Sequence, residues 1–105
     1  MDEHQGLTAT ADLFKVLSSE SRLLLVKLLA AEPATVGTLV NKTGMSQPLV
    51  SQHLRTLRQA NILIVARSGR EATYQLADHH IAHVIDDAII HVLEERTNTT
   101  EGETP

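Results

Sequence analysis

The sequence contains no cysteine, which excludes disulfide bonds and every redox switch or metal site that depends on a thiolate. Soft metals that need sulfur ligands, such as Cu(I), are therefore poor candidates. No apolar run approaches the roughly 18 residues that a membrane span requires. The most apolar stretch, 23–31, is short, contains Lys27 and lies too far from the start for a signal peptide. These absences predict a cytoplasmic protein without a membrane partner.

Enzymatic motifs are also missing. The chain has no H-E-x-x-H and no nucleophile motif, and its 105 residues leave little room for a sizeable pocket. A metal-dependent hydrolase acting on a small organic substrate thus has little support, and ester turnover with zinc bound would be its test. The length fits one small domain, whose modest core would gain stability from dimerisation.

Acidic residues are absent from the middle of the chain. The formal net charge is -4, yet residues 42–70 hold Lys42 and four arginines without any Asp or Glu, while both flanks are acidic in net. Because a DNA-binding face needs local rather than overall positive charge, this distribution favours a basic nucleic-acid surface between two acidic ends.

Capping residues and periodicity divide the chain into elements. Residues 1–6 and 96–105 are polar and are expected to be flexible tails on a domain spanning 7–95. Within that domain, the pattern predicts helices over 7–17, 19–32, 35–43, 46–61 and 78–95, and a hairpin over 62–76. Gly44 follows the third helix, and Pro48 lies in the first turn of the fourth.

The third and fourth helices, separated by a tight turn, are typical of a helix-turn-helix. Gln, Ser and Arg side chains can bond to base edges and phosphates. The residues expected to face DNA from the fourth helix are Ser46, Gln47, Leu49, Ser51, Gln52, His53 and Arg55. The hairpin adds Arg67 and Arg70 near its tip, as a wing. A polar surface helix and a solvated turn are the alternatives, which the motif spacing and the local charge disfavour.

The last predicted helix has two stripes. Its apolar face consists of Ile81, Val84, Ile85, Ala88, Ile89 and Val92. A polar stripe beside it holds His80, His91 and Glu94, and Asp78 stands at the helix start. Imidazole and carboxylate groups are ligands that zinc accepts.

The spacing of these ligands predicts a dimer. His80 and His91 are separated by about 16 Å along a helix, which no single ion with bonds of about 2 Å can bridge. An antiparallel copy would bring His91 and Glu94 of one chain beside Asp78 and His80 of the other, giving two symmetric sites. Solvated histidines, or a one-chain chelate of His83, Asp87 and His91, remain alternatives.

Two segments, SQPLVSQHLRTLRQANIL and RSGREATYQL, resemble the DNA-binding core of the ArsR/SmtB family of metal-responsive bacterial repressors, and the likeness extends over about residues 10–95. One zinc-sensing class of that family carries D-x-H, ten intervening residues and then H-x-x-E or H-x-x-H on the last helix. Asp78, His80, His91 and Glu94 match this pattern here. The resemblance implies a mainly α winged helix-turn-helix with a two-stranded β wing, which forms a homodimer through its first and last helices. It also implies double-stranded operator DNA bound by the metal-free protein and released by metal.

Further expectations depend on this resemblance. It implies that the second ring nitrogen of a coordinated His91 donates to a backbone carbonyl near Asn61. This hydrogen bond would connect the metal site to the fourth helix, which is the recognition helix of the helix-turn-helix. A second, cysteine-dependent site is expected to be absent, since residues 34–37 contain no thiol. Two imidazoles and two carboxylates suit Zn²⁺, and Co²⁺ fits the same cage. Ni²⁺ usually takes more ligands, which His83, Asp87 or the tail would supply. A regulator responding to nickel or to a non-metal signal, and a winged-helix module that binds protein, are the alternative functions.

Overall fold

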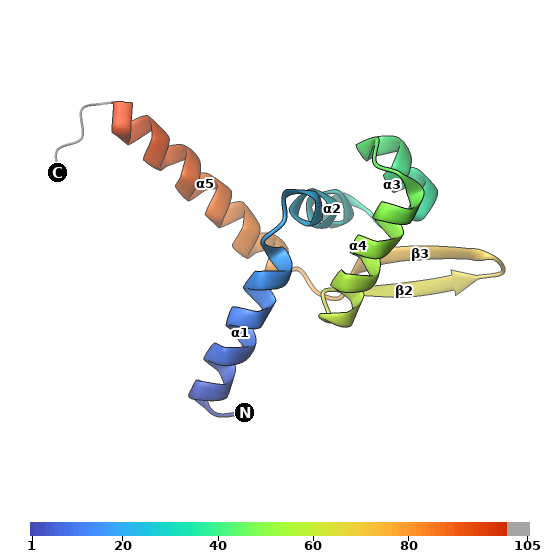
Figure 1. Ribbon diagram of the computed structural model, residues 1–105, viewed down its shortest axis with the longest axis horizontal. Helices are drawn as coiled ribbons and strands as arrows, with labels where there is room; N and C mark the ends of the chain where they lie inside the picture. The colour runs from blue at the N-terminus through green and yellow to red at the C-terminus, as the bar shows by residue number, and fades with distance from the viewer. Residues whose placement is uncertain (101–105) are drawn as a thin grey trace.

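The computed structural model describes the backbone of residues 1–100 and the side chains of residues 1–94. Over this range the elements are α1 Glu3–Leu17, α2 Glu20–Ala31, β1 Ala34–Thr35, α3 Val36–Thr43, α4 Gln47–Gln59, β2 Leu63–Ser68, β3 Glu71–Leu76 and α5 His80–Thr100 (Figure 1). The predicted order of two helices, a helix-turn-helix, a hairpin and a last helix is confirmed.

Both terminal helices are longer than predicted. The Asp2 carboxylate accepts the backbone N–H of Gln5 at 2.8 Å, and the Gln5 side chain accepts that of Asp2 at 2.9 Å. This capping box starts α1 at Glu3, so the expectation of a flexible tail over 1–6 is wrong for residues 3–6. Helix α5 continues through Thr100, because no Gly or Pro interrupts residues 96–100. The remainder of the expected acidic tail, 101–105, lies outside the described residues.

The helix-turn-helix consists of α3 and α4, and Gly44 ends the first of them as predicted. Thr35 accepts the backbone N–H of Thr38 at the start of α3, and Gly44 ends that helix with φ +77°. This left-handed conformation favours glycine. Ser46 then caps α4 by accepting the N–H of Leu49 at 3.3 Å. The turn therefore fixes the direction in which α4 leaves the body of the domain.

Strands β2 and β3 form the predicted hairpin, with Leu63 opposite Leu76 and Ser68 opposite Glu71. Strand β1 pairs with the other edge of β3, so the sheet has three strands in the order β1-β3-β2 rather than the two expected. The two residues of β1 are too few to show a period, and only their pairing with β3 makes them a strand.

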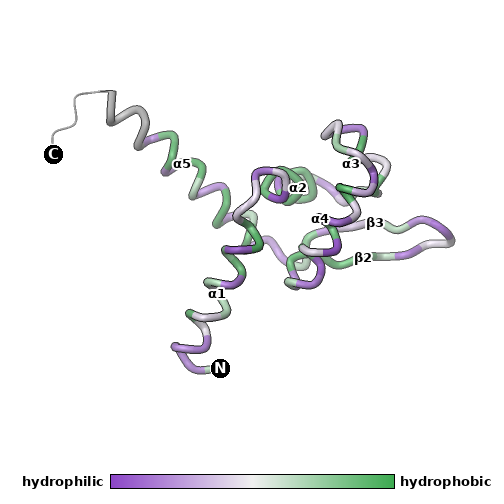
Figure 2. The backbone as a smooth tube through the Cα atoms, viewed as in Figure 1, coloured by the Kyte–Doolittle hydropathy of each residue, from purple (hydrophilic) through white to green (hydrophobic). Residues whose placement is uncertain are grey.

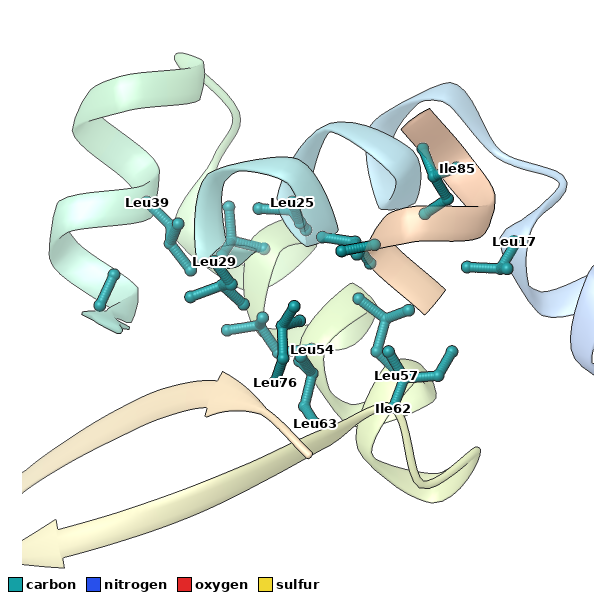
Figure 3. Close-up of a cluster of buried hydrophobic side chains, with 14 residues drawn as sticks. Leu17, Leu25, Leu29, Leu39, Leu54, Leu57, Ile62, Leu63, Leu76 and Ile85 are labelled. Carbon is teal, nitrogen blue, oxygen red and sulfur yellow. The ribbon is translucent and has the colours of Figure 1, made fainter. Parts of the chain in front are cut away.

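The core lies among α2, α3, α4 and the base of the hairpin (Figure 3). Its largest fully buried side chains are Leu25, Val26, Leu39, Val50, Leu54, Leu57 and Leu63. Among the side chains of residues 1–94, helix α5 contributes only Ala82 and Ile85 to the buried set, and α1 only Leu17. The terminal helices are thus attached to the core at one end only.

Helices α1 and α5 lean away from this body in different directions (Figure 1). The radius of gyration is 16.3 Å, compared with about 13 Å for a compact domain of this length. Hydrophobic residues continue along both projecting helices (Figure 2), and Phe14, Ile89 and Val92 are 50%, 40% and 49% exposed. The chain folds around one core and leaves an apolar surface outside it.

Candidate DNA-binding surface and metal site

Helix α4 turns one side to the core and the other to solvent. Val50, Leu54 and Leu57 are fully buried on the inner side. Ser51 is half-buried, and its hydroxyl accepts a hydrogen bond from the Gln47 amide at 3.2 Å. The exposed members of the predicted DNA-facing set on α4 and its cap are Ser46, Gln47, Leu49, Gln52 and Arg55. Apart from Leu49, these side chains are polar, and they lie on the outer side of α4 and its cap.

His53 lies apart from this surface. Its Nδ1 is 3.3 Å from Nη1 of Arg22, and Nε of Arg22 donates to the carbonyl of Val16 at 2.6 Å. Burial, and then the positive charge of Arg22, lower the pKa of His53 below its usual value of 6.5. The structure therefore directs this side chain toward Arg22 of α2.

The wing places arginines beside α4. Because side chains alternate along a strand, Leu63, Val65 and Arg67 lie on the same face of the hairpin. Leu63 is buried in the core, and Arg67 on the same face is exposed. Between that face and α4 lies a hollow of about 490 Å³. Its lining residues are Ser51, Arg55, Arg58, Gln59, Arg67 and Tyr74. Arg70, in the turn at the tip, is exposed.

Three members of this lining were not among the predicted DNA-facing residues. Arg58 and Gln59 line the hollow from α4, and Tyr74 lines it from β3. Arg58 belongs to the basic, acid-free segment 42–70, and this local charge is the signal that could have included it. Tyr74 carried no comparable signal, because its position depends on how the hairpin packs against α4.

The four predicted metal ligands lie on α5 and the residues before it. The Asp78 carboxylate accepts the backbone N–H of His80 at 2.9 Å, which holds both residues at the helix start. His91 and Glu94 lie about three turns further along the helix, and all four side chains are exposed. Among the side chains of residues 1–94, no three His, Asp or Glu of one chain come together around a common point. The described side chains of a single chain thus do not form the four-ligand site by themselves.

An apolar groove of about 450 Å³ lies between α1 and α5. Its lining residues are Phe14, Leu17, Ser18, Leu23, Val84, Ile85, Ala88, Ile89, Val92 and Leu93. The predicted apolar face of the last helix supplies half of this lining. The groove therefore runs beside the stripe that carries the predicted ligands.

Asn61 ends the recognition helix in a left-handed conformation, with φ +63°. Its backbone N–H donates to the carbonyl of Arg58, and that of Ile62 donates to the carbonyl of Leu57, both at 3.0 Å. This pattern is a Schellman motif, in which Asn takes the position usually held by Gly. Asn61 thus fixes where α4 stops and β2 begins.

Comparisons with known proteins identify the family. A family model described as "Bacterial regulatory protein, arsR family" matches residues 19–65. The HTH-type transcriptional regulator NmtR of Mycobacterium tuberculosis is 35% identical over 89 residues, which cover 85% of this chain and 74% of NmtR. The chain belongs to the arsR family of bacterial regulatory proteins.

Another arsR-family relative is the HTH-type transcriptional repressor SmtB of Mycobacterium tuberculosis. It is 42% identical over 89 residues, which span 85% of this chain and 66%, just under two thirds, of SmtB. These relatives are regulators of transcription rather than enzymes, in agreement with the missing catalytic motifs.

A solved structure confirms the fold. The homodimeric winged helix-turn-helix DNA-binding domain of Mb0332 from Mycobacterium bovis superposes with a TM-score of 0.76 at 23% identity, over 94% of this chain and 93% of that one. The predicted winged helix-turn-helix is therefore correct. Within residues 1–100, no helix combines the length and the apolar character needed to cross a bilayer.

Proposed function

We propose that this arsR-family protein is a cytoplasmic homodimeric repressor that binds operator DNA without metal and releases it when zinc or cobalt binds. The metal would bind at sites shared between two α5 helices. One observation carries the proposal: Asp78 and His80 at the start of α5, and His91 and Glu94 about three turns later, flank an exposed apolar groove.

A second copy of the chain is the proposed occupant of the groove. Phe14 of α1 and Ile89 of α5 are half exposed on its two sides, and covering such side chains removes apolar surface from water. Two antiparallel α5 helices would then place the start of one beside the distal turns of the other. The same packing that covers the groove would complete the ligand set.

Operator binding follows from the surface around α4. In a dimer, two recognition helices can enter successive major grooves about 34 Å apart. The proposed DNA contacts are Ser46, Gln47, Leu49, Ser51, Gln52, Arg55, Arg67 and Arg70. The amides and hydroxyls suit base edges, whereas the arginines suit guanine or phosphate.

The donor set fits a small divalent cation. Two imidazole nitrogens and two carboxylates, from Asp78 and His80 of one chain and His91 and Glu94 of the other, match the ligands of tetrahedral zinc. When bound, the ion supplies a fixed link between the two α5 helices. Because one oxygen of Asp78 already accepts the N–H of His80, its carboxylate is held in place before any metal arrives.

Regulation requires that the linked dimer fit DNA less well than the unlinked one. Coupling of this kind is reciprocal and usually changes affinity about 5- to 150-fold. We propose that His91 transmits the change through a hydrogen bond from its second ring nitrogen to a backbone carbonyl near Asn61. A shift there would alter the angle of α4 relative to the groove.

The test is fluorescence anisotropy of a labelled DNA fragment from upstream of the gene, titrated first with metal-free protein and then with zinc. We expect binding that zinc weakens at least about fivefold and that a chelator restores. His91→Gln should abolish the zinc response while preserving DNA binding by the metal-free protein. His79→Gln is the matched control, because it removes an exposed histidine outside the polar stripe that carries the ligands.

The outcomes separate the candidate functions. DNA binding that is indifferent to zinc and cobalt but responds to nickel would assign the alternative metal, with His83 and Asp87 as further ligands to test. Indifference to all three metals would leave a regulator that responds to a non-metal signal. A zinc response that survives His91→Gln would contradict the proposed role of His91.

A further inference from the structure

We propose that the hollow between α4 and the wing holds one phosphate of the DNA backbone, and that Arg58 and Tyr74 contact DNA there. This inference rests on the proposed operator binding and specifies how part of the duplex is held. It adds two residues that line the hollow, Arg58 from α4 and Tyr74 from β3.

The lining supplies three guanidinium groups from two elements. Arg55 and Arg58 are three residues apart on α4, so they are neighbours on its surface. Arg67 comes from β2, on the face of the hairpin that leads out of the core. The planar donor fork of arginine matches phosphate oxygens, often through two parallel hydrogen bonds. The hollow thus has the chemistry of a phosphate site.

These arginines have no acidic partner in the described part of the chain. The carboxylates that form ion pairs there do so with lysines: Asp12 with Lys15, Asp86 with Lys27 and Glu32 with Lys42. Three like charges around one hollow repel one another, and a bound anion would relieve that repulsion. Their arrangement is therefore better suited to an external anion than to stabilising the free fold.

Tyr74 contributes a different group. Its half-buried ring packs against the core, opposite Val65 in the hairpin, while the residue also lines the hollow. Within residues 1–94, no hydrogen bond engages its hydroxyl, which can therefore donate to a phosphate oxygen. The core would hold the ring at a fixed position beside the arginines.

The position of the hollow favours a backbone phosphate over a free anion. It lies between the exposed side of α4, which would read the major groove, and the wing that carries Arg67 and Arg70. A duplex that receives α4 must carry one sugar–phosphate strand past the flank of that helix. The hollow lies on that flank.

The first experiment measures the salt dependence of operator affinity. Each phosphate contact contributes roughly 0.9 to the magnitude of the slope of log K against log salt. Because a homodimer presents the hollow twice, Arg58→Gln should reduce that magnitude by about two. Tyr74→Phe should leave the slope unchanged and weaken binding about 5- to 150-fold, as expected for one lost hydrogen bond in each of the two hollows. Lys15→Gln is the matched charge control on α1, and it should change neither quantity.

The second experiment uses the fact that the chain has one tyrosine. Protein labelled with fluorotyrosine gives a fluorine NMR signal from position 74 alone. We expect that signal to shift when operator duplex is added and to remain in place with inorganic phosphate at the same ionic strength. The two arms thereby distinguish a backbone phosphate from a free anion.

Failure of this inference differs from failure of the proposed function. One outcome would overturn the phosphate site alone. In it, the wild-type protein binds the operator, and Arg58→Gln and Tyr74→Phe have the same affinity and salt slope as the wild type. A fluorine shift produced by inorganic phosphate but not by DNA would assign the hollow to a small anion instead. Wild-type protein that binds no operator would overturn both proposals.

Discussion

The imidazole of His53 links the recognition helix to the turn between α1 and α2. Arg22 donates to the carbonyl of Val16 through Nε and contacts Nδ1 of His53 through Nη1, at 2.6 Å and 3.3 Å. Because arginine is a permanent donor, the imidazole must act as the acceptor in its neutral form. A proton on Nδ1 would remove that acceptor and place a second cation beside Arg22.

Acidification should therefore destabilise the fold through His53. Its pKa is lowered in the folded protein by burial and by Arg22, so the unfolded chain binds this proton more strongly. The contribution of His53 to stability is complete above the ordinary pKa of about 6.5 and is lost as the pH falls through the lower folded value. Denaturant unfolding of wild type and His53→Gln at several pH values measures the difference. The prediction is contradicted if the difference in unfolding free energy between wild type and His53→Gln stays constant between about pH 7 and pH 5.

At this scale the sequence predicts positions on a helix better than it predicts partners. His53 lies about 60° around α4 from the buried Val50, whereas Gln52 lies nearly opposite. Periodicity alone could therefore have moved His53 from the outer surface to the flank. The contact with Arg22, 31 residues earlier in the chain, depends on the packing of α2 against α4, which no local pattern contains.

At the scale of elements, α3 and the turn after it contain two glycines with opposite roles. Gly44 ends the helix with φ +77°, a conformation that strains any residue with a Cβ. Gly37 lies within the helix, where an added Cβ would meet only Oγ1 of Thr35 at an ordinary contact distance of 3.9 Å. One glycine is required by geometry, and the other is replaceable.

Alanine at these two positions should change stability in opposite directions. Gly44→Ala should lower the free energy of unfolding by about 1–2 kcal/mol. Gly37→Ala should raise it by about 0.5–1 kcal/mol, because alanine loses less backbone entropy in a helix. Thermal and urea unfolding of both variants provide the comparison. Equal effects of the same sign would show that the turn is not held in the left-handed region.

Element boundaries are predictable where a short-range cap sets them. Ser19, Thr35, Ser46 and Gly44 each act through hydrogen bonds to residues within four positions. The helices predicted from the sequence begin at the first three of these residues or end just before the fourth. The predicted start of α1 is wrong, although the Asp2–Gln5 capping box is an equally local signal. Strand β1 could not be predicted in this way, because its two residues become a strand only through pairing with β3, almost forty residues later.

At the scale of the whole molecule, the apolar periodicity of the last helix is enough to indicate dimerisation. The structure places that apolar face along a groove shared with α1, which periodicity within α5 could not specify. The winged helix-turn-helix was predictable, because its turn and hairpin signals are local. The assembly of the metal site stays a prediction, since its ligands belong to two chains.

A charge in the groove should separate the proposed dimer. Ile89→Glu places a carboxylate on the apolar surface that a second copy would cover, and burying an unpaired charge is strongly unfavourable. Ile64→Glu is the matched control, because Ile64 has a similar exposure, 46% compared with 40%, and lies outside the groove lining. Sedimentation velocity should show a monomer for the first variant and a dimer for the second. A dimer that survives Ile89→Glu would place the interface elsewhere.

Helix α5 is anchored to the rest of its own chain mainly through its first turns, by Ala82, Ile85 and the ion pair of Asp86 with Lys27 at 2.7 Å. Half of the proposed ligand set, His91 and Glu94, lies beyond that anchor. If two chains are needed to form the site, metal affinity will rise with the concentration of the protein itself. The cell would then set the threshold of this sensor partly through how many copies it makes.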